Sequence, residues 1–130
     1  MKISSTYTIA LELLLICEKY KDSEKITSGS VSKKIGADSA IVRRVMSDLK
    51  NSNLIESKPG PGGTVLAKPL SKITLYDVFI SVTEKEDSIL KFYDLPTNSP
   101  FEANIIQVSN TLFDNYIDSF YQQLKSHTLD

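Results

Sequence analysis

Residues 27–67 decide the fold, and their sequence is TSGSVSKKIGADSAIVRRVMSDLKNSNLIESKPGPGGTVLA. Within this stretch Val31 and Ile35 are four residues apart, so they share one face of a short helix. Gly36 ends that helix, because glycine tolerates the left-handed conformation common at helix C-termini. In the tight connection that follows, Asp38 or Ser39 can accept hydrogen bonds from the free amides of a second helix, which begins near Ser39. The pattern predicts a helix-turn-helix.

The second predicted helix has an apolar stripe and an opposite face of basic and small residues. The stripe consists of Ile41, Val42, Val45, Met46 and Leu49. Small and basic residues near the start of a helix are typical of helices that enter the major groove of DNA. We therefore predict DNA contacts from Ser39, Ala40, Arg43 and Arg44, and from Ser28 at the start of the first helix.

Two short strand-like runs, residues 54–58 and 64–67, flank a loop of prolines and glycines. Turn residues between such runs predict a β-hairpin, which we call the wing, and we expect Ile26 to pair briefly with it. Glycines let a backbone approach a sugar-phosphate surface closely. The predicted DNA contacts of the wing are Lys58, Gly60, Pro61, Gly62, Gly63 and Thr64.

The sequence resembles the IscR/NsrR/CymR-type winged helix-turn-helix transcriptional regulators of bacteria (the Rrf2 family). The matching motifs are KPGPGG at 58–63, LAKP at 66–69, ITLYDV at 73–78 and YTIAL at 7–11. They cover most of the chain in the order that the family has. The resemblance implies a mainly α protein with a small β-hairpin wing and a long C-terminal dimerisation helix, acting as a homodimeric DNA-binding repressor or activator.

The chain contains one cysteine, Cys17, which excludes an internal disulfide and an all-cysteine metal site. Members of the resembled family that sense iron, nitric oxide or redox state hold an iron–sulfur cluster on three closely spaced cysteines before the last helix. Residues 84–100 contain none, so the resemblance narrows to the cluster-less, YwnA-like branch. We predict no cofactor and no metal site. Cys17 itself is interpreted as a small buried hydrophobe; a redox-sensing thiol is the alternative, and it would need exposure and a lowered pKa.

The charge is unevenly distributed although the net charge is only -1. Residues 1–75 hold 12 Lys and Arg against 7 Asp and Glu, whereas residues 76–130 hold 3 against 9. A duplex-binding face needs only a local positive surface, so the acidic total does not exclude DNA. No apolar run reaches membrane-spanning length, and we predict a cytoplasmic protein with no membrane partner. Neither a phosphate-binding glycine loop nor a nucleophile–base pair is evident, so we predict no enzymatic activity.

A first helix is predicted over residues 5–20, with Leu14 and Leu15 in its apolar stripe. A short helix is predicted after Thr74, which with Asp77 three residues later resembles a capping box.

A long amphipathic helix is predicted from Pro100 onward, with Ser99 as its cap and Glu102 in its first turn. Its apolar residues recur every three or four positions over about five turns, more than one small domain needs. Residues 125–130 are predicted to be a frayed tail. We predict a homodimer formed through Ile105, Leu112, Phe113, Tyr116, Ile117 and Phe120.

The predicted organisation has three parts: a winged helix-turn-helix domain at 1–84, a linker at 85–98 and the dimerisation helix at 99–130. The linker occupies the sensor position of the family, so Phe92, Tyr93 and Leu95 are interpreted as packing residues, with a pocket for a small-molecule or protein effector as the alternative. Our main hypothesis is a homodimeric transcription regulator that binds a pseudo-palindromic operator in double-stranded DNA. We favour a repressor over an activator. The alternatives are a winged-helix module that regulates a partner protein and a thiol-based redox sensor acting through Cys17.

Overall fold

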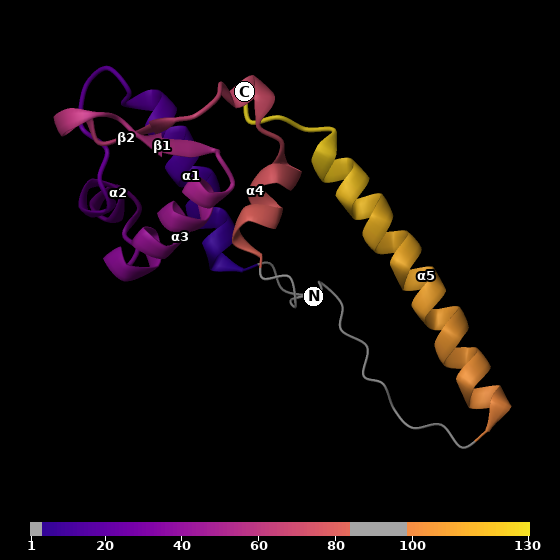
Figure 1. Ribbon diagram of the computed structural model, residues 1–130. Coiled ribbons are helices and arrows are strands. Elements are labelled where there is room, and N and C mark those ends of the chain that lie inside the picture. Colours follow the sequence, from indigo (N-terminus) through magenta and orange to yellow (C-terminus); the bar gives the residue numbers. More distant parts are fainter. Residues whose placement is uncertain (1–3, 84–98) are drawn as a thin grey trace.

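The computed structural model describes residues 4–83 and 99–130 (Figure 1). The predicted linker lies outside the described residues. Four short helices and a hairpin form one packed body, and a long C-terminal helix extends beside it. The elements are α1 (Ser5–Lys19), α2 (Ser28–Ile35), α3 (Ser39–Asn51), β1 (Ile55–Ser57), the 3₁₀ turn η1 (Gly60–Gly62), β2 (Thr64–Leu66), the 3₁₀ turn η2 (Leu70–Lys72), α4 (Leu75–Val82) and α5 (Pro100–Lys125).

The hydrophobic core lies between α1, α3 and α4, with contributions from α2 and the hairpin. Its completely buried side chains include Leu13, Leu14, Val31, Val42, Val45, Leu49, Ile73 and Val78. The predicted stripes were too wide at two positions, since Leu15 is 47% exposed and Ile41 is 42% exposed. Consecutive residues of a helix point about 100° apart, so each of these neighbours of a core residue falls outside the covered arc.

The predicted hairpin is confirmed. Strand β1 pairs antiparallel with β2, and Glu56 lies opposite Val65 in the register. Ile26 pairs with the wing as expected, through one isolated parallel bridge with Gly63 and a hydrogen bond from the Thr64 N–H to the Ile26 carbonyl at 2.9 Å. The segment that enters the helix-turn-helix is therefore joined directly to the base of the wing.

The start of α4 is fixed by the capping box that its sequence predicts. The Asp77 N–H donates to Thr74 Oγ1 at 3.0 Å, and the Thr74 N–H donates to Asp77 Oδ2 at 2.9 Å. Ser99 caps α5 in the expected way, accepting from the Glu102 N–H at 3.2 Å, with Pro100 at the first helical position. No helix in the described parts of the chain is long and apolar enough to cross a membrane.

The prediction of a frayed C-terminal tail is wrong. After α5 the chain reverses, and Thr128 forms an antiparallel bridge with Thr74 beside the start of α4. The Leu75 N–H donates to the His127 carbonyl at 2.9 Å, and Leu129 is partly buried against the core. One apolar residue and a backbone that pairs with its neighbour are enough to order a segment whose composition is otherwise that of a solvated end.

Candidate nucleic-acid interface

Local hydrogen bonds and one glycine fix the ends of α2 and the start of α3. Thr27 caps α2 through a capping box, since the Ser30 N–H donates to Thr27 Oγ1 at 3.1 Å and the Thr27 N–H donates to Ser30 Oγ at 2.9 Å. Gly36 has a φ of +71° and ends α2 as predicted. Asp38, one of the two predicted caps of α3, accepts from the Ala40 N–H at 2.8 Å. Thr27 therefore sets where α2 begins, and Asp38 sets where α3 begins.

Helix α3 buries one side and exposes a basic side. Val42, Val45, Met46 and Leu49 are buried in the core. The exposed residues are Ala40, Ile41, Arg43, Arg44, Ser47, Lys50 and Asn51. Arg43 and Arg44 therefore lie together on the surface near the start of α3, as the sequence predicted, while Ser39 is half-buried at the first helical position.

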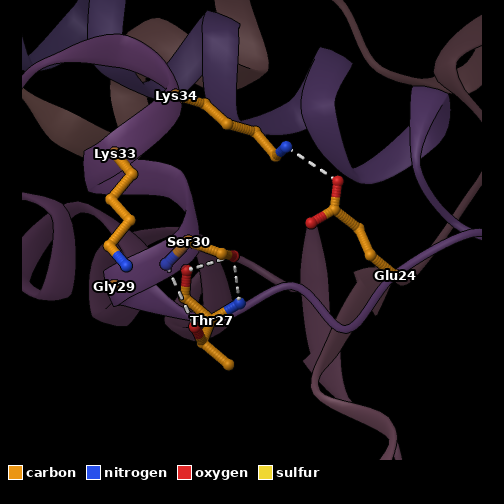
Figure 2. A pocket seen from close by; sticks show the side chains of 6 residues that line it. All are labelled: Glu24, Thr27, Gly29, Ser30, Lys33 and Lys34. Atoms are coloured by element: carbon orange, nitrogen blue, oxygen red, sulfur yellow. Dashed lines mark hydrogen bonds and ion pairs between the residues drawn. The ribbon is translucent and has the colours of Figure 1, made fainter.

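A shallow hollow of about 550 Å³ lies at the start of α2 (Figure 2), and its lining residues are Glu24, Thr27, Gly29, Ser30, Lys33 and Lys34. The predicted contact residue Ser28 is half-buried beside it, at the first position of α2. Sequence reasoning missed Lys33, which is exposed and places a positive charge at this hollow. Its position, two residues after the buried Val31, was the available signal.

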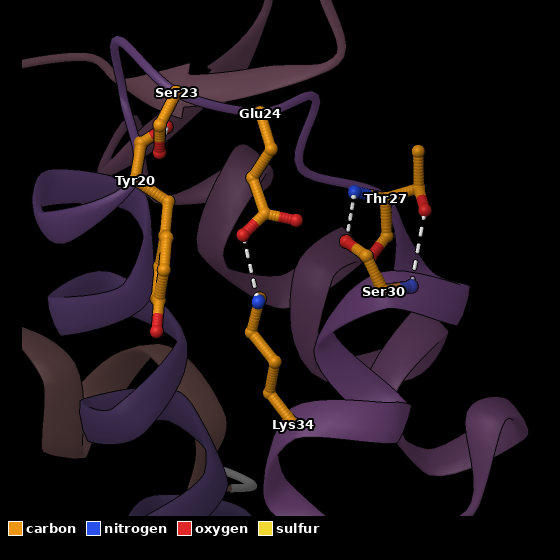
Figure 3. A network of polar contacts seen from close by, with 6 residues as sticks. All are labelled: Tyr20, Ser23, Glu24, Thr27, Ser30 and Lys34. Carbon is orange, nitrogen blue, oxygen red and sulfur yellow. Dashed lines mark hydrogen bonds and ion pairs between the residues drawn. The ribbon is translucent and has the colours of Figure 1, made fainter.

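The second lysine of this hollow is held by neighbouring residues. Lys34 Nζ lies 2.7 Å from Glu24 Oε1 and 4.0 Å from the centroid of the Tyr20 ring (Figure 3). The hydrogen bond to Glu24 raises the pKa of Lys34. Because the carboxylate offsets much of this charge, Lys34 contributes less to the positive surface than Lys33 does.

The wing is a tight turn that requires glycine. Lys58 and Gly60 are exposed, and the Lys58 N–H donates to the Gly63 carbonyl at 2.8 Å. At Gly62 a Cβ atom would lie 2.5 Å from Cδ of Lys58, so the lysine side chain crosses the glycine closely. Helices α2 and α3 and the wing occupy the end of the body away from α5 (Figure 1).

The prediction that Thr64 contacts DNA is wrong. It is only 6% exposed, and its backbone N–H is bonded to Ile26. The strand alternation that places Val65 outward turns Thr64 inward. Thr64 therefore has almost no surface to offer DNA, and it holds the wing against the body instead.

Cys17 meets neither requirement of the redox-sensor interpretation. It is 2% exposed, inside the face of α1 that packs on the core. Burial raises the pKa of its thiol to about 11, whereas a reactive thiol needs a lowered pKa. The structure contradicts the redox interpretation and agrees with a small buried hydrophobe.

Comparison with known proteins supplies the family. The sequence model of the Rrf2 family, described as iron-dependent transcriptional regulators, matches residues 3–130. The chain belongs to the Rrf2 family. The expected resemblance is thereby confirmed for nearly the whole chain, the wing motif and α5 included.

Individual relatives agree with this Rrf2 assignment. The chain is 35% identical to YwgB of Bacillus subtilis, named as an HTH-type transcriptional regulator, over 83 residues that make up 63% of the chain and 53% of YwgB. It thus spans about half the length of that relative. YwnA of the same organism, also named as an HTH-type regulator, is 23% identical over 128 residues, 98% of this chain and 93% of YwnA. The structure of CymR, the global cysteine regulator of B. subtilis, has the same fold, with a TM-score of 0.70 at 22% identity over 99% of this chain and 93% of CymR.

The description of the Rrf2 family as iron-dependent raises the question of whether this chain could hold an iron–sulfur cluster. Such clusters are held mainly by several cysteine thiolates. The chain has one cysteine, and that thiol is buried among apolar side chains of the core. In residues 4–83 and 99–130, no three His, Cys, Asp or Glu side chains come together as a metal site. The donor set does not fit a cysteine-held cluster.

Proposed function

We propose that this Rrf2 protein is a transcription regulator that binds an inverted-repeat operator in duplex DNA as a homodimer. The observation that carries the proposal is the exposed pair Arg43 and Arg44 on the first turns of α3, whose start is fixed by the cap of Asp38. A helix presented in this way fits the major groove, where arginine can donate two hydrogen bonds to guanine.

The other contacts follow from the arrangement around α3. Ser39 and Ala40 stand at the end of the helix that would face base edges. Ser28 lies at the start of α2, where free backbone amides and the helix dipole favour a phosphate group. The wing contributes Lys58 and the residues of its turn, Gly60, Pro61, Gly62 and Gly63, to the sugar-phosphate backbone or the minor groove. Thr64 is left out of this set because it is buried.

The proposed dimer is supported by the uncovered surface of α5. No residue of this helix is buried by the described chain. Phe101, Ile105, Val108, Leu112 and Tyr116 are each more than half exposed, and they follow one another in steps of three or four along one stripe. Phe113, Ile117 and Phe120 lie on the adjacent, half-covered face, and Phe120 contacts Phe79 of its own chain. We assign the interface chiefly to the exposed stripe, which includes three of the predicted residues.

The regulator is also proposed to work without an iron–sulfur cluster, since its cysteine content and the burial of Cys17 do not fit one. We propose that it represses transcription in the cytoplasm, and that an effector controls it either by binding to the linker or through a partner protein.

The test is to select bound sequences from a random pool of DNA duplexes with the purified chain, at two salt concentrations. Enrichment of an inverted repeat, with affinity falling as salt rises, is the expected result. Arg43→Glu and Arg44→Glu should each weaken operator binding by about tenfold or more, because each loses a contact worth about 1–3 kcal/mol and adds repulsion.

The matched control is Lys72→Glu, which makes the same charge change at an exposed residue of η2, outside the proposed interface. It should retain most of the affinity. Equal losses of operator affinity for Arg43→Glu, Arg44→Glu and Lys72→Glu would mean that only the net charge of the protein affects binding. A lack of any enriched sequence, with Arg43→Glu and Arg44→Glu indifferent, would favour the alternative of a module that regulates a partner protein.

A further inference from the structure

The reversed C-terminal segment, residues 126–129, ties the end of α5 to the body. Leu129 N–H donates to the Ile73 carbonyl at 3.0 Å and to the Leu70 carbonyl at 3.3 Å, and Leu75 N–H donates to the His127 carbonyl at 2.9 Å. Ser126 makes the reversal possible, since its N–H and hydroxyl both donate to the carbonyl of Gln123, at 3.2 and 2.7 Å. The chain end lies close to η2 and the start of α4 in Figure 1.

Aromatic contacts hold the same end of α5 from a second side. The buried ring of Phe79 on α4 lies 6.2 Å from the ring of Phe120 and 5.9 Å from that of Tyr121. Tyr121 also packs against Tyr76 at 5.4 Å, and Lys125 Nζ lies 4.6 Å from the centroid of the Tyr76 ring. Two independent sets of contacts therefore oppose rotation of α5 about its end. We use the name joint for residues 126–129 together with the aromatic contacts of Tyr76, Phe79, Phe120 and Tyr121.

The joint lies between the two working surfaces of the protein. On one side, α4 packs against α3, which carries Arg43 and Arg44. On the other side, the exposed stripe of α5 runs from Phe101 to Tyr116 and ends one turn before Phe120. Any change of angle at the joint changes where the recognition helix lies relative to the proposed dimer contact.

We infer that the joint fixes this angle, so that residues 126–129 determine which spacing between operator half-sites the dimer accepts. The inference depends on the proposed function. Binding of the second half-site is an intramolecular step, and a stiff connection concentrates the second α3 at one position on the duplex. One added base pair moves that half-site by about 3.4 Å and rotates it by about 34°, which a stiff joint resists.

The test compares the wild-type chain with a variant that ends at Ser126 and with Leu129→Ala, which keeps the backbone but removes the apolar anchor. Thr128→Ala is the matched control, because Thr128 is exposed and its hydroxyl bonds only the neighbouring Asp130 among the contacts that the structure shows. Each protein is titrated with the selected operator, with operators one base pair longer or shorter between half-sites, and with a single half-site. Sedimentation and thermal melting confirm that each is folded and that its oligomeric state is unchanged.

For the wild type and Thr128→Ala, we expect the selected spacing to be preferred by about tenfold or more. In the shortened chain that preference should fall to about threefold or less, while single half-site affinity is unchanged. Leu129→Ala should fall between the two, and it decides the matter if the shortened chain does not fold. An unchanged preference in both variants would overturn the inference and leave the proposed function intact. Failure of the wild-type chain to prefer any inverted repeat would overturn both.

Discussion

Gly60 and Gly63 offer a comparison at the scale of single residues, since both have a φ of +74° and only one is crowded. A Cβ at Gly63 would lie 2.7 Å from the Ile26 carbonyl oxygen, whereas nothing lies within 4 Å at Gly60. Gly63→Ala should therefore lower the free energy of unfolding by about 3 kcal/mol or more, combining backbone strain with a broken contact to Ile26. Gly60→Ala should cost about 1–2 kcal/mol, from strain alone.

Urea unfolding of both glycine variants measures this difference. Equal losses would mean that the Ile26 segment moves aside at little cost, and that its bridge to Gly63 does not hold the wing.

Cys17 predicts a dependence of stability on pH. Burial raises the pKa of its thiol from 9.0 to about 11, so the folded state disfavours the thiolate that the unfolded chain can form. The contribution of the protonated thiol is complete below pH 9 and is lost as pH rises toward 11. Cys17→Ala should be less stable than wild type at neutral pH, because it leaves a cavity. Its stability should not fall through thiol ionisation as pH rises, because alanine has no thiol.

The gap in unfolding free energy between the wild type and Cys17→Ala should therefore narrow by about 2 kcal/mol between about pH 8 and about pH 10.5. Parallel curves over that range would show that the thiol does not titrate differently in the two states.

At the scale of elements, local signals in the sequence were sufficient to predict most helix ends. Thr74 and Asp77 form the capping box that their spacing implied, and Asp38, Gly36 and Ser99 act as the caps and stop that were expected. Each of these depends on residues no more than three positions away, which is why the sequence reveals them. The hairpin was visible for the same reason.

Features that depend on distant contacts could not be predicted in this way. The order of residues 126–129 depends on hydrogen bonds to Leu70, Ile73 and Leu75, more than fifty positions away in the sequence. The burial of Thr64 depends on its pairing with Ile26. Likewise, periodicity placed Phe120 in the dimer contact, although the ring packs on Phe79 of its own chain. Arg43 and Arg44 were predictable as a surface pair because α3 is regular, but the arrangement around them was not.

The cap of α3 provides a prediction for an element. Asp38 accepts hydrogen bonds from the N–H groups of Ala40 at 2.8 Å and Ile41 at 3.4 Å. Asp38→Ala should lower the free energy of unfolding by about 1 kcal/mol, whereas Asp38→Asn, which can still cap, should cost about 0.5 kcal/mol or less. Chemical unfolding of the three proteins measures both values, and equal losses for Ala and Asn would show that the carboxylate charge rather than the cap stabilises α3.

At the scale of the whole molecule, the body and α5 differ in how much of their apolar surface is covered. The body has a closed core in which α1 to α4 and the hairpin cover one another. Helix α5 has no buried residue, although its outer stripe carries Phe101, Ile105, Val108, Leu112 and Tyr116. An exposed apolar stripe of this length is typical of a protein–protein interface, and a second copy of α5 offers a matching stripe.

The corresponding prediction concerns the oligomeric state. Leu112→Glu and Tyr116→Glu together should convert the dimer to a monomer at micromolar concentration, because each places a charge where two apolar stripes would meet. Gln107→Glu is the control, since this exposed residue lies on the opposite side of α5 and gains the same kind of charge. Sedimentation equilibrium gives the mass of each protein, and thermal melting shows that the body remains folded.

The monomer should also lose the concentration dependence of its melting temperature and its preference for an inverted repeat over a single half-site. Retention of a dimer by the double variant would move the interface to the half-covered face of α5 that carries Phe113 and Ile117. Dissociation by Gln107→Glu as well would mean that added charge anywhere on α5 separates the subunits. If instead the double variant is a monomer with a folded body and Gln107→Glu remains a dimer, then the outer stripe of α5 joins the two winged domains.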